Sequence, residues 1–170
     1  MSWKLPRDWK RQEALTAIKL NTEIRDKMLY LFDKPHTVLT VRDVNYTTTS
    51  TSWVTVDDRV FTLNVETFGG DVIVELHGLV DTNSGVQRVD LDLWIDDSYY
   101  LSSGAATPNS FGFASSQGRF AGSDRTLAGF KVLTNLPAGI HKFQLRWKVS
   151  GATGTLRTVD VPLQLVVREL

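Results

Sequence analysis

The chain has 170 residues with 19 basic and 19 acidic side chains, so its formal net charge is zero. This balance gives no overall field that would favour nucleic acid or an anionic membrane as a partner. The sequence contains no cysteine, which excludes disulfides, thiolate nucleophiles and thiolate metal sites.

No apolar run approaches the roughly 20 residues needed to cross a bilayer. The first ten residues, MSWKLPRDWK, lack the apolar core of a signal peptide. We therefore expect neither membrane insertion nor secretion through a signal peptide. Aromatic residues make up 10% of the chain, including five Trp. Together with abundant Thr, Val, Ser and Gly, this is typical of an all-β domain with many turns.

The N-terminal part, residues 1–35, predicts an arm followed by an attachment helix. From residue 13 to residue 32, apolar side chains recur at steps of three, four and seven, the pattern of an amphipathic helix. Thr16 is a plausible N-cap, and Pro35 ends the segment. The stripe is too short for a stable coiled coil, so the β domain, sister chains or another protein must cover it. The predicted attachment and oligomer surface comprises Trp3, Trp9, Leu20, Ile24, Met28 and Leu31.

Residues 36–170 predict a single β domain. Eight or nine short runs alternate between apolar and polar residues, and turn sequences such as Gly69-Gly70-Asp71 and Leu136–Gly139 separate them. The stretch from Ser102 to Asp124 is too long for a simple hairpin loop and is expected to contain a weak strand. Because no helical pattern lies between the runs, they predict an antiparallel β-sandwich or jelly roll.

The last thirty-two residues carry the cleanest period-2 pattern. One apolar face is formed by Phe143, Leu145, Trp147 and Val149, and a second run buries Leu163, Leu165 and Val167. The Gly-rich segment between the two runs predicts a turn. We interpret the pair as an antiparallel hairpin whose second strand is paired well within a sheet.

The run GIHKFQLRWKVSGATG, followed by LQLVVREL, resembles the closing strands of C1q and tumour-necrosis-factor type jelly rolls in bacteriophage tail and fibre proteins. There a Gly-x-His-x-Phe-x-Leu-x-Trp strand, a Gly-rich turn and a final Glu-Leu are common. The matching positions are Gly139, His141, Phe143, Leu145, Trp147, Gly151, Gly154, Glu169 and Leu170.

The N-terminal run LTAIKLNTEIRDKMLYL, preceded by Trp9, resembles the segment before such domains in phage minor tail proteins. The matching residues are Trp9, Leu15, Thr16, Ala17, Leu20, Asn21, Ile24, Arg25 and Asp26. The resemblance implies a homotrimer, with the flat inner sheets of three jelly rolls around a threefold axis. It also implies outward loops that contact a host surface or a neighbouring virion protein.

Catalytic and metal-binding patterns are weak. His36, His77 and His141 share no ligand spacing, and His141 is expected to be a satisfied core or interface residue. The acidic residues Asp90, Asp92, Asp96 and Asp97 predict mainly solvent-facing charge with a turn. A Ca²⁺ site formed by these residues is the less favoured alternative.

Aromatic side chains mostly predict core packing. Four lie in or beside turn-rich sequence, where the loops of a sandwich carry binding. These residues, the predicted ligand-contact loops, are Tyr99, Tyr100, Phe111 and Phe113.

Together these observations favour a non-enzymatic bacteriophage virion protein that is assembled in the host cytoplasm. We expect a trimeric tail-tip or tail-fibre component that attaches to the host or to neighbouring tail proteins, with no cofactor. A capsid decoration protein and a glycan-binding, lectin-like module remain alternatives. A polysaccharide depolymerase would need paired carboxylates, and Glu66 and Glu75 have no spacing that enforces such a pair. Which sheet would form the trimer interface stays open.

Overall fold

The computed structural model describes residues 14, 16–25, 28, 34 and 36–170. The N-terminal helix begins with α1 (Ala17–Leu20) and continues as a π-helical segment, η1 (Asn21–Arg25). Thr16 caps α1 as predicted, because its hydroxyl accepts a hydrogen bond from the backbone N–H of Lys19 at 3.3 Å.

The part of the chain from His36 onwards is built from ten strands. Their bounds are β1 (His36–Val41), β2 (Tyr46–Thr48), β3 (Val54–Thr55), β4 (Thr62–Thr82), β5 (Arg88–Ile95), β6 (Tyr99–Tyr100), β7 (Ala114–Gln117), β8 (Arg125–Val149), β9 (Gly154–Leu156) and β10 (Leu163–Glu169).

All strand pairs are antiparallel, and hydrogen bonds link the ten strands continuously. The long strands β4 and β8 bend together, so this sheet folds into two layers, which we call the first and the second sheet. In the first sheet, β1 pairs with β10, β10 with the later half of β4, and that half with the earlier half of β8. In the second sheet, the earlier half of β4 pairs with the later half of β8, which pairs with β5. β6 and β7 continue this sheet beyond β5, while β3 pairs with β8 and β9 joins β2 to β4.

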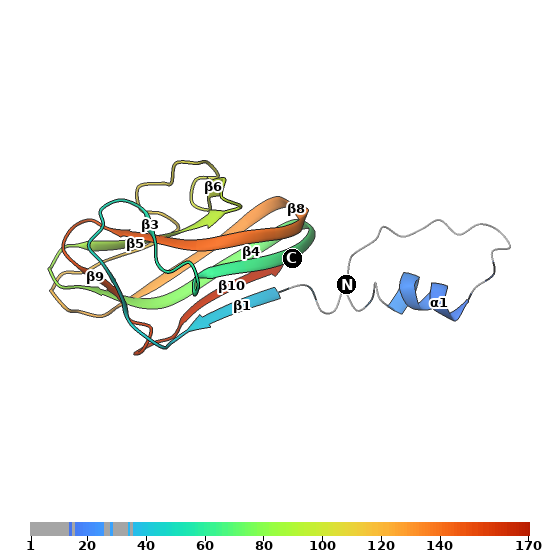
Figure 1. The fold of residues 1–170 in the computed structure, drawn as a ribbon, viewed down its shortest axis with the longest axis horizontal. Helices are drawn as coiled ribbons and strands as arrows, with labels where there is room; N and C mark the ends of the chain where they lie inside the picture. Colours follow the sequence, from blue (N-terminus) through green and yellow to red (C-terminus); the bar gives the residue numbers. More distant parts are fainter. Residues whose placement is uncertain (1–13, 15, 26–27, 29–33, 35) are drawn as a thin grey trace.

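Figure 1 shows β5 and the later part of β8 on one side of the molecule and β1 and β10 on the other. A long antiparallel ribbon that runs through both packed sheets is the defining feature of a jelly roll. The structure therefore confirms the predicted all-β, antiparallel jelly-roll sandwich.

The sandwich core is formed by the alternating apolar residues that the period-2 pattern predicts. Inward-facing side chains of both sheets belong to one buried cluster, so the two sheets share a single core. Its largest fully buried members are Phe61, Leu76, Leu91, Leu93, Ile95, Leu101, Leu127, Phe143, Leu145, Leu156 and Leu163, with Trp147 among them.

The predicted turns at Gly69-Gly70-Asp71 and Leu136–Gly139 are instead bends inside β4 and β8. Gly70 pairs with Leu136, so the two strands bend together and stay hydrogen-bonded through the corner. Gly69 and Gly70 have φ angles of 94° and 154°, which favour glycine, and the register shifts just after Gly70. Turn residues in the sequence are compatible with a turn between two strands and with a bend inside one strand. Only the pairing with a partner strand distinguishes the bend from the turn.

The predicted C-terminal hairpin is wrong in its pairing. The later half of β8 lies in the second sheet, whereas β10 lies in the first sheet between β1 and β4. The intervening β9 carries the chain across from one sheet to the other. The buried faces predicted for both strands and the internal position of β10 are nevertheless confirmed.

The weak strand predicted between Ser102 and Asp124 is β7, which pairs with β5 from Arg88 to Leu91. The segment before it, which connects β6 to β7, runs along the edge of β5: the backbone N–H groups of Leu101 and Phe113 donate to the carbonyls of Leu93 and Leu91 at 2.8 Å.

Candidate interaction surfaces

The exposed apolar stripe of the N-terminal helix is present in the described part of the predicted attachment surface. No residue of α1 is buried, and Leu20, Ile24 and Met28 are 40%, 50% and 50% exposed. Trp3, Trp9 and Leu31 lie outside the described residues. Within the described segments, no helix is long and apolar enough to cross a membrane. The attachment role of this surface stays a prediction.

The four predicted ligand-contact aromatics occupy different environments. Phe111 is 57% exposed, and its ring lies 4.4 Å from the Cζ atom of Arg88. Tyr100 is buried, with its ring centroid 4.4 Å from that of Trp94. Tyr99 and Phe113 are partly buried against the core. Phe111 therefore has the most accessible ring of the four.

The prediction that Asp90 and Asp92 face solvent is wrong, because both side chains are fully buried. The segment after β6 covers Asp92, which accepts hydrogen bonds from the Ser102 hydroxyl at 2.5 Å and the Ser102 N–H at 3.1 Å. Burial raises the pKa of Asp92, although these bonds and the charge of Lys131 act in the opposite direction.

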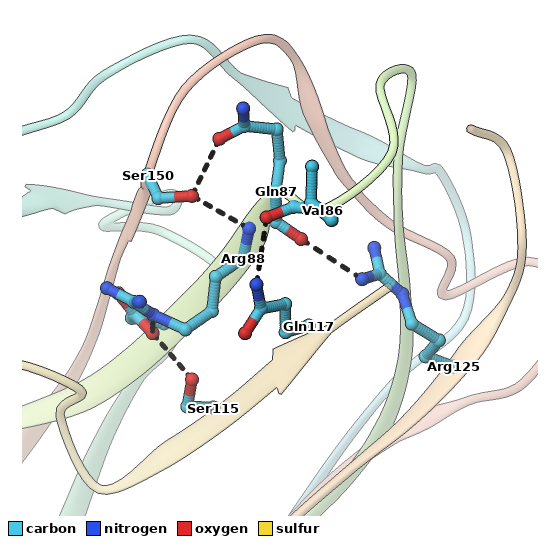
Figure 2. A network of polar contacts seen from close by, with 8 residues as sticks. Val86, Gln87, Arg88, Ser115, Gln117, Arg125 and Ser150 are labelled. Carbon is cyan, nitrogen blue, oxygen red and sulfur yellow. Dashed lines mark hydrogen bonds and ion pairs between the residues drawn. The ribbon is translucent and has the colours of Figure 1, made fainter. Parts of the chain in front are cut away.

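Asp90 is covered by Arg88, whose Nε donates to Asp90 Oδ1 at 2.6 Å. The Ser115 hydroxyl on β7 donates to the same oxygen at 2.6 Å (Figure 2). Asp90 Oδ2 is buried and has no hydrogen-bond partner. The side chain thus supports the junction of β5 and β7.

The four aspartates do not converge. Asp96 and Asp97 form the predicted tight turn, each with a φ of 51°. Both carboxylates contact Lys142 and not Asp90 or Asp92. Asp96 accepts from the backbone N–H of Lys142 at 2.8 Å, and Asp97 binds the Lys142 ammonium at 3.0 Å. Across the described residues, no three His, Asp or Glu side chains are grouped closely enough to hold a metal ion.

The loop between β4 and β5 is held by a polar network, shown in Figure 2. The Ser150 hydroxyl donates to Gln87 Oε1 at 2.8 Å, and Arg125 Nη1 donates to the Gln87 carbonyl at 3.2 Å. Gln117 Nε2 donates to the carbonyl of Val86 at 2.9 Å. Val86 has a φ of 58°, which is strained for a β-branched residue, and the surrounding bonds maintain it.

His141 is a buried, satisfied position, as predicted. Its Nδ1 lies 2.7 Å from Asp96 Oδ2, and its Nε2 lies 2.8 Å from the carbonyl of Pro137. A carboxylate and a carbonyl both accept hydrogen bonds, so this arrangement favours the doubly protonated ring. Burial alone would lower the pKa, but the bonds to Asp96 and Pro137 and the charge of Asp96 outweigh it. The pKa of His141 is therefore raised above its ordinary value.

The outer face of the first sheet carries exposed apolar residues, including Val38 and Phe130. Register places three rows of side chains across β1, β10, β4 and β8, and we call these rows the first-sheet face. The rows are His36, Arg168, Ile73 and Val132; Val38, Val166, Glu75 and Phe130; and Thr40, Gln164, His77 and Ala128.

Two members of the central row are strongly exposed: Phe130 is 64% and Val38 is 50% accessible. An open pocket of about 360 Å³ beside Phe130 is lined by Glu75, His77, Ala128 and Gly129. Arg168 Nη2 lies 3.9 Å from Glu75 Oε1 on the same face. Apolar residues gathered across four strands with an accessible hollow form a candidate docking surface.

No protein-family model and no curated protein matches this chain in sequence. Several solved structures resemble it at low identity. The structure of the infectious bursal disease virus Gt strain is 14% identical with a TM-score of 0.48, over 81% of this chain and 38% of the viral chain. The globular domain of zebrafish complement 1qA is 11% identical with a TM-score of 0.46, over 81% of this chain and 98% of that domain. The chain thus spans little more than a third of the viral chain.

A second surface lies on the outer face of the second sheet, and it combines cations with aromatic rings. Arg146 Cζ lies 4.9 Å from the ring centroid of Trp94 and 5.7 Å from that of Tyr100. Lys148 Nζ lies 5.0 Å from the ring centroid of Trp53. We call Trp53, Trp94, Tyr100, Arg146 and Lys148 the cation–aromatic face.

The sequence carries only part of the signal for these two surfaces. Alternation places Arg146 and Lys148 opposite the buried face of their strand, and Trp94 opposite that of β5. Trp53 lies directly before β3 and Tyr100 lies in β6, and these two-residue strands beside β8 and β5 are too short for periodicity to predict. Likewise, the first-sheet face combines residues that lie far apart in the chain, such as the paired residues His36 and Arg168.

Proposed function

We propose that this protein is a non-enzymatic structural component of a bacteriophage virion, which assembles as a homotrimer through the first-sheet face. The observation that carries the proposal is the apolar surface formed by Val38, Val166 and Phe130 across three strands of that face. The resemblance of the two terminal sequence runs to phage tail proteins supports the virion assignment.

Two features of the first-sheet face favour association with copies of the same chain: its apolar residues and its mixed charges. In a two-layer antiparallel sandwich, the outer face of a sheet is normally polar, so apolar residues on both faces indicate that a further layer covers it. The face also holds an acid, Glu75, and bases, Arg168 and His77. A surface with both signs of charge can complement itself around a symmetry axis.

Within the virion, we place the protein at the tail tip or tail fibre. The exposed stripe of Leu20, Ile24 and Met28 would bind a neighbouring virion protein, and the β domain would remain available for host contact. A capsid position would use the same two surfaces. The virion location therefore follows from the resemblance of the N-terminal run to phage minor tail proteins.

The mass of the protein in solution tests the proposal. Light scattering of the full chain should give three times the chain mass of 19.1 kDa. Phe130→Asp should yield monomers, because a carboxylate would be desolvated at the centre of the proposed interface.

Phe120→Asp is the matched control, since Phe120 is a 73% exposed phenylalanine in the loop after β7. It should remain trimeric. A monomeric wild-type chain would overturn the proposed trimer, and a trimer that survives Phe130→Asp would place the interface elsewhere. Circular dichroism of each variant distinguishes loss of association from loss of folding.

A further inference from the structure

Arg146 and Lys148 project two cations from the same side of β8. They are two residues apart, so their Cα atoms are separated by roughly 6 to 7 Å along the strand. Arg146 uses its Nη1 to donate to the Tyr100 hydroxyl at 2.9 Å and its Nε to reach Gln144 Oε1 at 3.4 Å. No hydrogen bond to a described residue involves its Nη2 or the Lys148 ammonium, so these donors can bind a ligand.

Neither cation has an anionic partner in the described part of the chain. The other basic residues nearby are paired: Arg88 with Asp90 at 2.6 Å and Lys142 with Asp97 at 3.0 Å. Asp90 and Asp92 lie directly across from Lys148 and Arg146 in the register. Their carboxylates are bound instead by Arg88 with Ser115 and by Ser102. Arg146 and Lys148 therefore form no direct ion pair with a described residue, and their free donors can bind an external anion.

The aromatic rings fix these cations and extend the surface. The guanidinium of Arg146 lies over the rings of Trp94 and Tyr100, which hold it in place, and its Nη2 can donate a charge-assisted hydrogen bond to a carboxylate. Trp53 and Trp94 are only partly buried, so each still offers apolar ring surface beside a charged group. A carboxylate next to apolar C–H surface is the chemistry of an acidic sugar.

The cation–aromatic face lies on the second sheet. Figure 1 shows two strands of that sheet, β5 and the later part of β8, on the opposite side of the molecule from β1 and β10 of the first sheet. Self-association through the first sheet would leave it accessible on each subunit. We infer that the cation–aromatic face binds carboxylate-bearing polysaccharides, with Arg146 and Lys148 on the carboxylate and Trp53 and Trp94 on the sugar ring. This deepens the host-contact part of the proposed function, on which it rests for the source of the ligand.

Binding of the full chain to polygalacturonate, alginate, hyaluronate and colominic acid tests the inference, with dextran as the neutral polysaccharide. At least one acidic polysaccharide should bind, more weakly as salt is added, whereas dextran should not. Lys148→Gln and Arg146→Gln should each weaken that binding about tenfold or more, as expected when a charge-assisted hydrogen bond is lost.

Lys142→Gln is the matched control, because Lys142 projects from the same strand but is already paired with Asp97. Its affinity should match that of the wild type. Absence of binding to all four acidic polysaccharides overturns the inference, as does binding that survives both Arg146→Gln and Lys148→Gln. Equal affinity for single-stranded DNA also overturns it, since that would indicate general attraction to polyanions.

Light scattering of the same variants separates this inference from the proposed trimer. Lys148 forms no hydrogen bond or ion pair with a described residue, so Lys148→Gln should leave the mass in solution unchanged. Glycan binding by a monomeric protein would overturn the trimer and keep the ligand. A trimer that binds none of the acidic polysaccharides would overturn the proposed ligand and keep the proposed trimer.

Discussion

At the scale of single residues, His141 shows how the fold raises the pKa of a side chain. The bend in β8 brings the Pro137 carbonyl to one ring nitrogen, and the turn after β5 brings the Asp96 carboxylate to the other. The same carboxylate also accepts the backbone N–H of Lys142, so Asp96 joins the end of β5 to β8. The imidazole of His141 is thus part of the contact between two neighbouring strands.

We expect the free energy of unfolding to fall as the pH rises through the raised pKa of His141. The folded state binds this proton more tightly than the unfolded chain does. Its contribution is therefore complete below the unfolded pKa of about 6.5 and is lost above the folded pKa. Urea unfolding at a series of pH values from about 5.5 to 9 measures the slope.

The variant His141→Gln isolates this contribution. It should cost about 1 to 3 kcal/mol at the acid end, the usual loss for a buried bond to a charged group, and should flatten the slope. His36 and His77 are exposed and remain in both proteins, so they act as an internal reference. The same slope in the wild type and the variant would contradict the assignment to His141.

At the scale of elements, the β4–β8 ribbon organises the molecule. It continues through both sheets for 21 and 25 residues, and the corner at Gly69-Gly70 is where it passes between them. The backbone N–H of Phe68 at this corner donates to Glu169 Oε2 at 3.0 Å. The end of β10 therefore fixes the bend in β4, which explains why a carboxylate is buried in the terminal strand.

Glu169→Ala is expected to lower the free energy of unfolding by about 1 to 3 kcal/mol, because it removes the acceptor of a partly buried backbone N–H. Glu66→Ala is the control, since Glu66 is an exposed carboxylate on the same strand as Phe68 and should change stability by less than about 0.5 kcal/mol. Chemical denaturation of both variants measures the difference. Equal effects would show that the corner does not depend on Glu169.

At the scale of the whole molecule, the sandwich has two dissimilar outer faces. The first-sheet face is apolar with mixed charges, and the cation–aromatic face carries two cations without anionic partners among the described residues. Different chemistry on the two sides allows one to associate with copies while the other binds a ligand. The N-terminal helix adds a third exposed apolar surface.

A chain that begins at His36 should keep the trimeric mass and the β-sheet circular dichroism of the full chain. The reason is that every residue of the first-sheet face lies in the sequence from His36 onwards. Light scattering of the shortened and full chains provides the comparison. A trimer of the full chain together with a monomer of the shortened one would assign self-association to the N-terminal segment. The division into residues 1–35 and 36–170 remains a prediction that this comparison also examines.

The sequence alone determined the fold class and the core-facing side of the strands with the clearest alternation, such as β10 and the later half of β8. Leu163, Leu165 and Val167 alternate with other residues because a strand turns its side chains to opposite faces, and this is a local property. Only the tertiary structure decided which strands are neighbours. It placed β10 beside β1 and not beside β8, and it buried Asp90 and Asp92 under Arg88 and the segment after β6.

The candidate surfaces follow the same division. The exposed helix stripe and Phe111 were recognisable from periodicity and turn residues, whereas the rows through Phe130 and the stack on Arg146 were not. Their members come from segments far apart in the chain. Strand pairing is chosen by the packing of the whole core and by non-local hydrogen bonds, and neither is present in any single stretch of sequence.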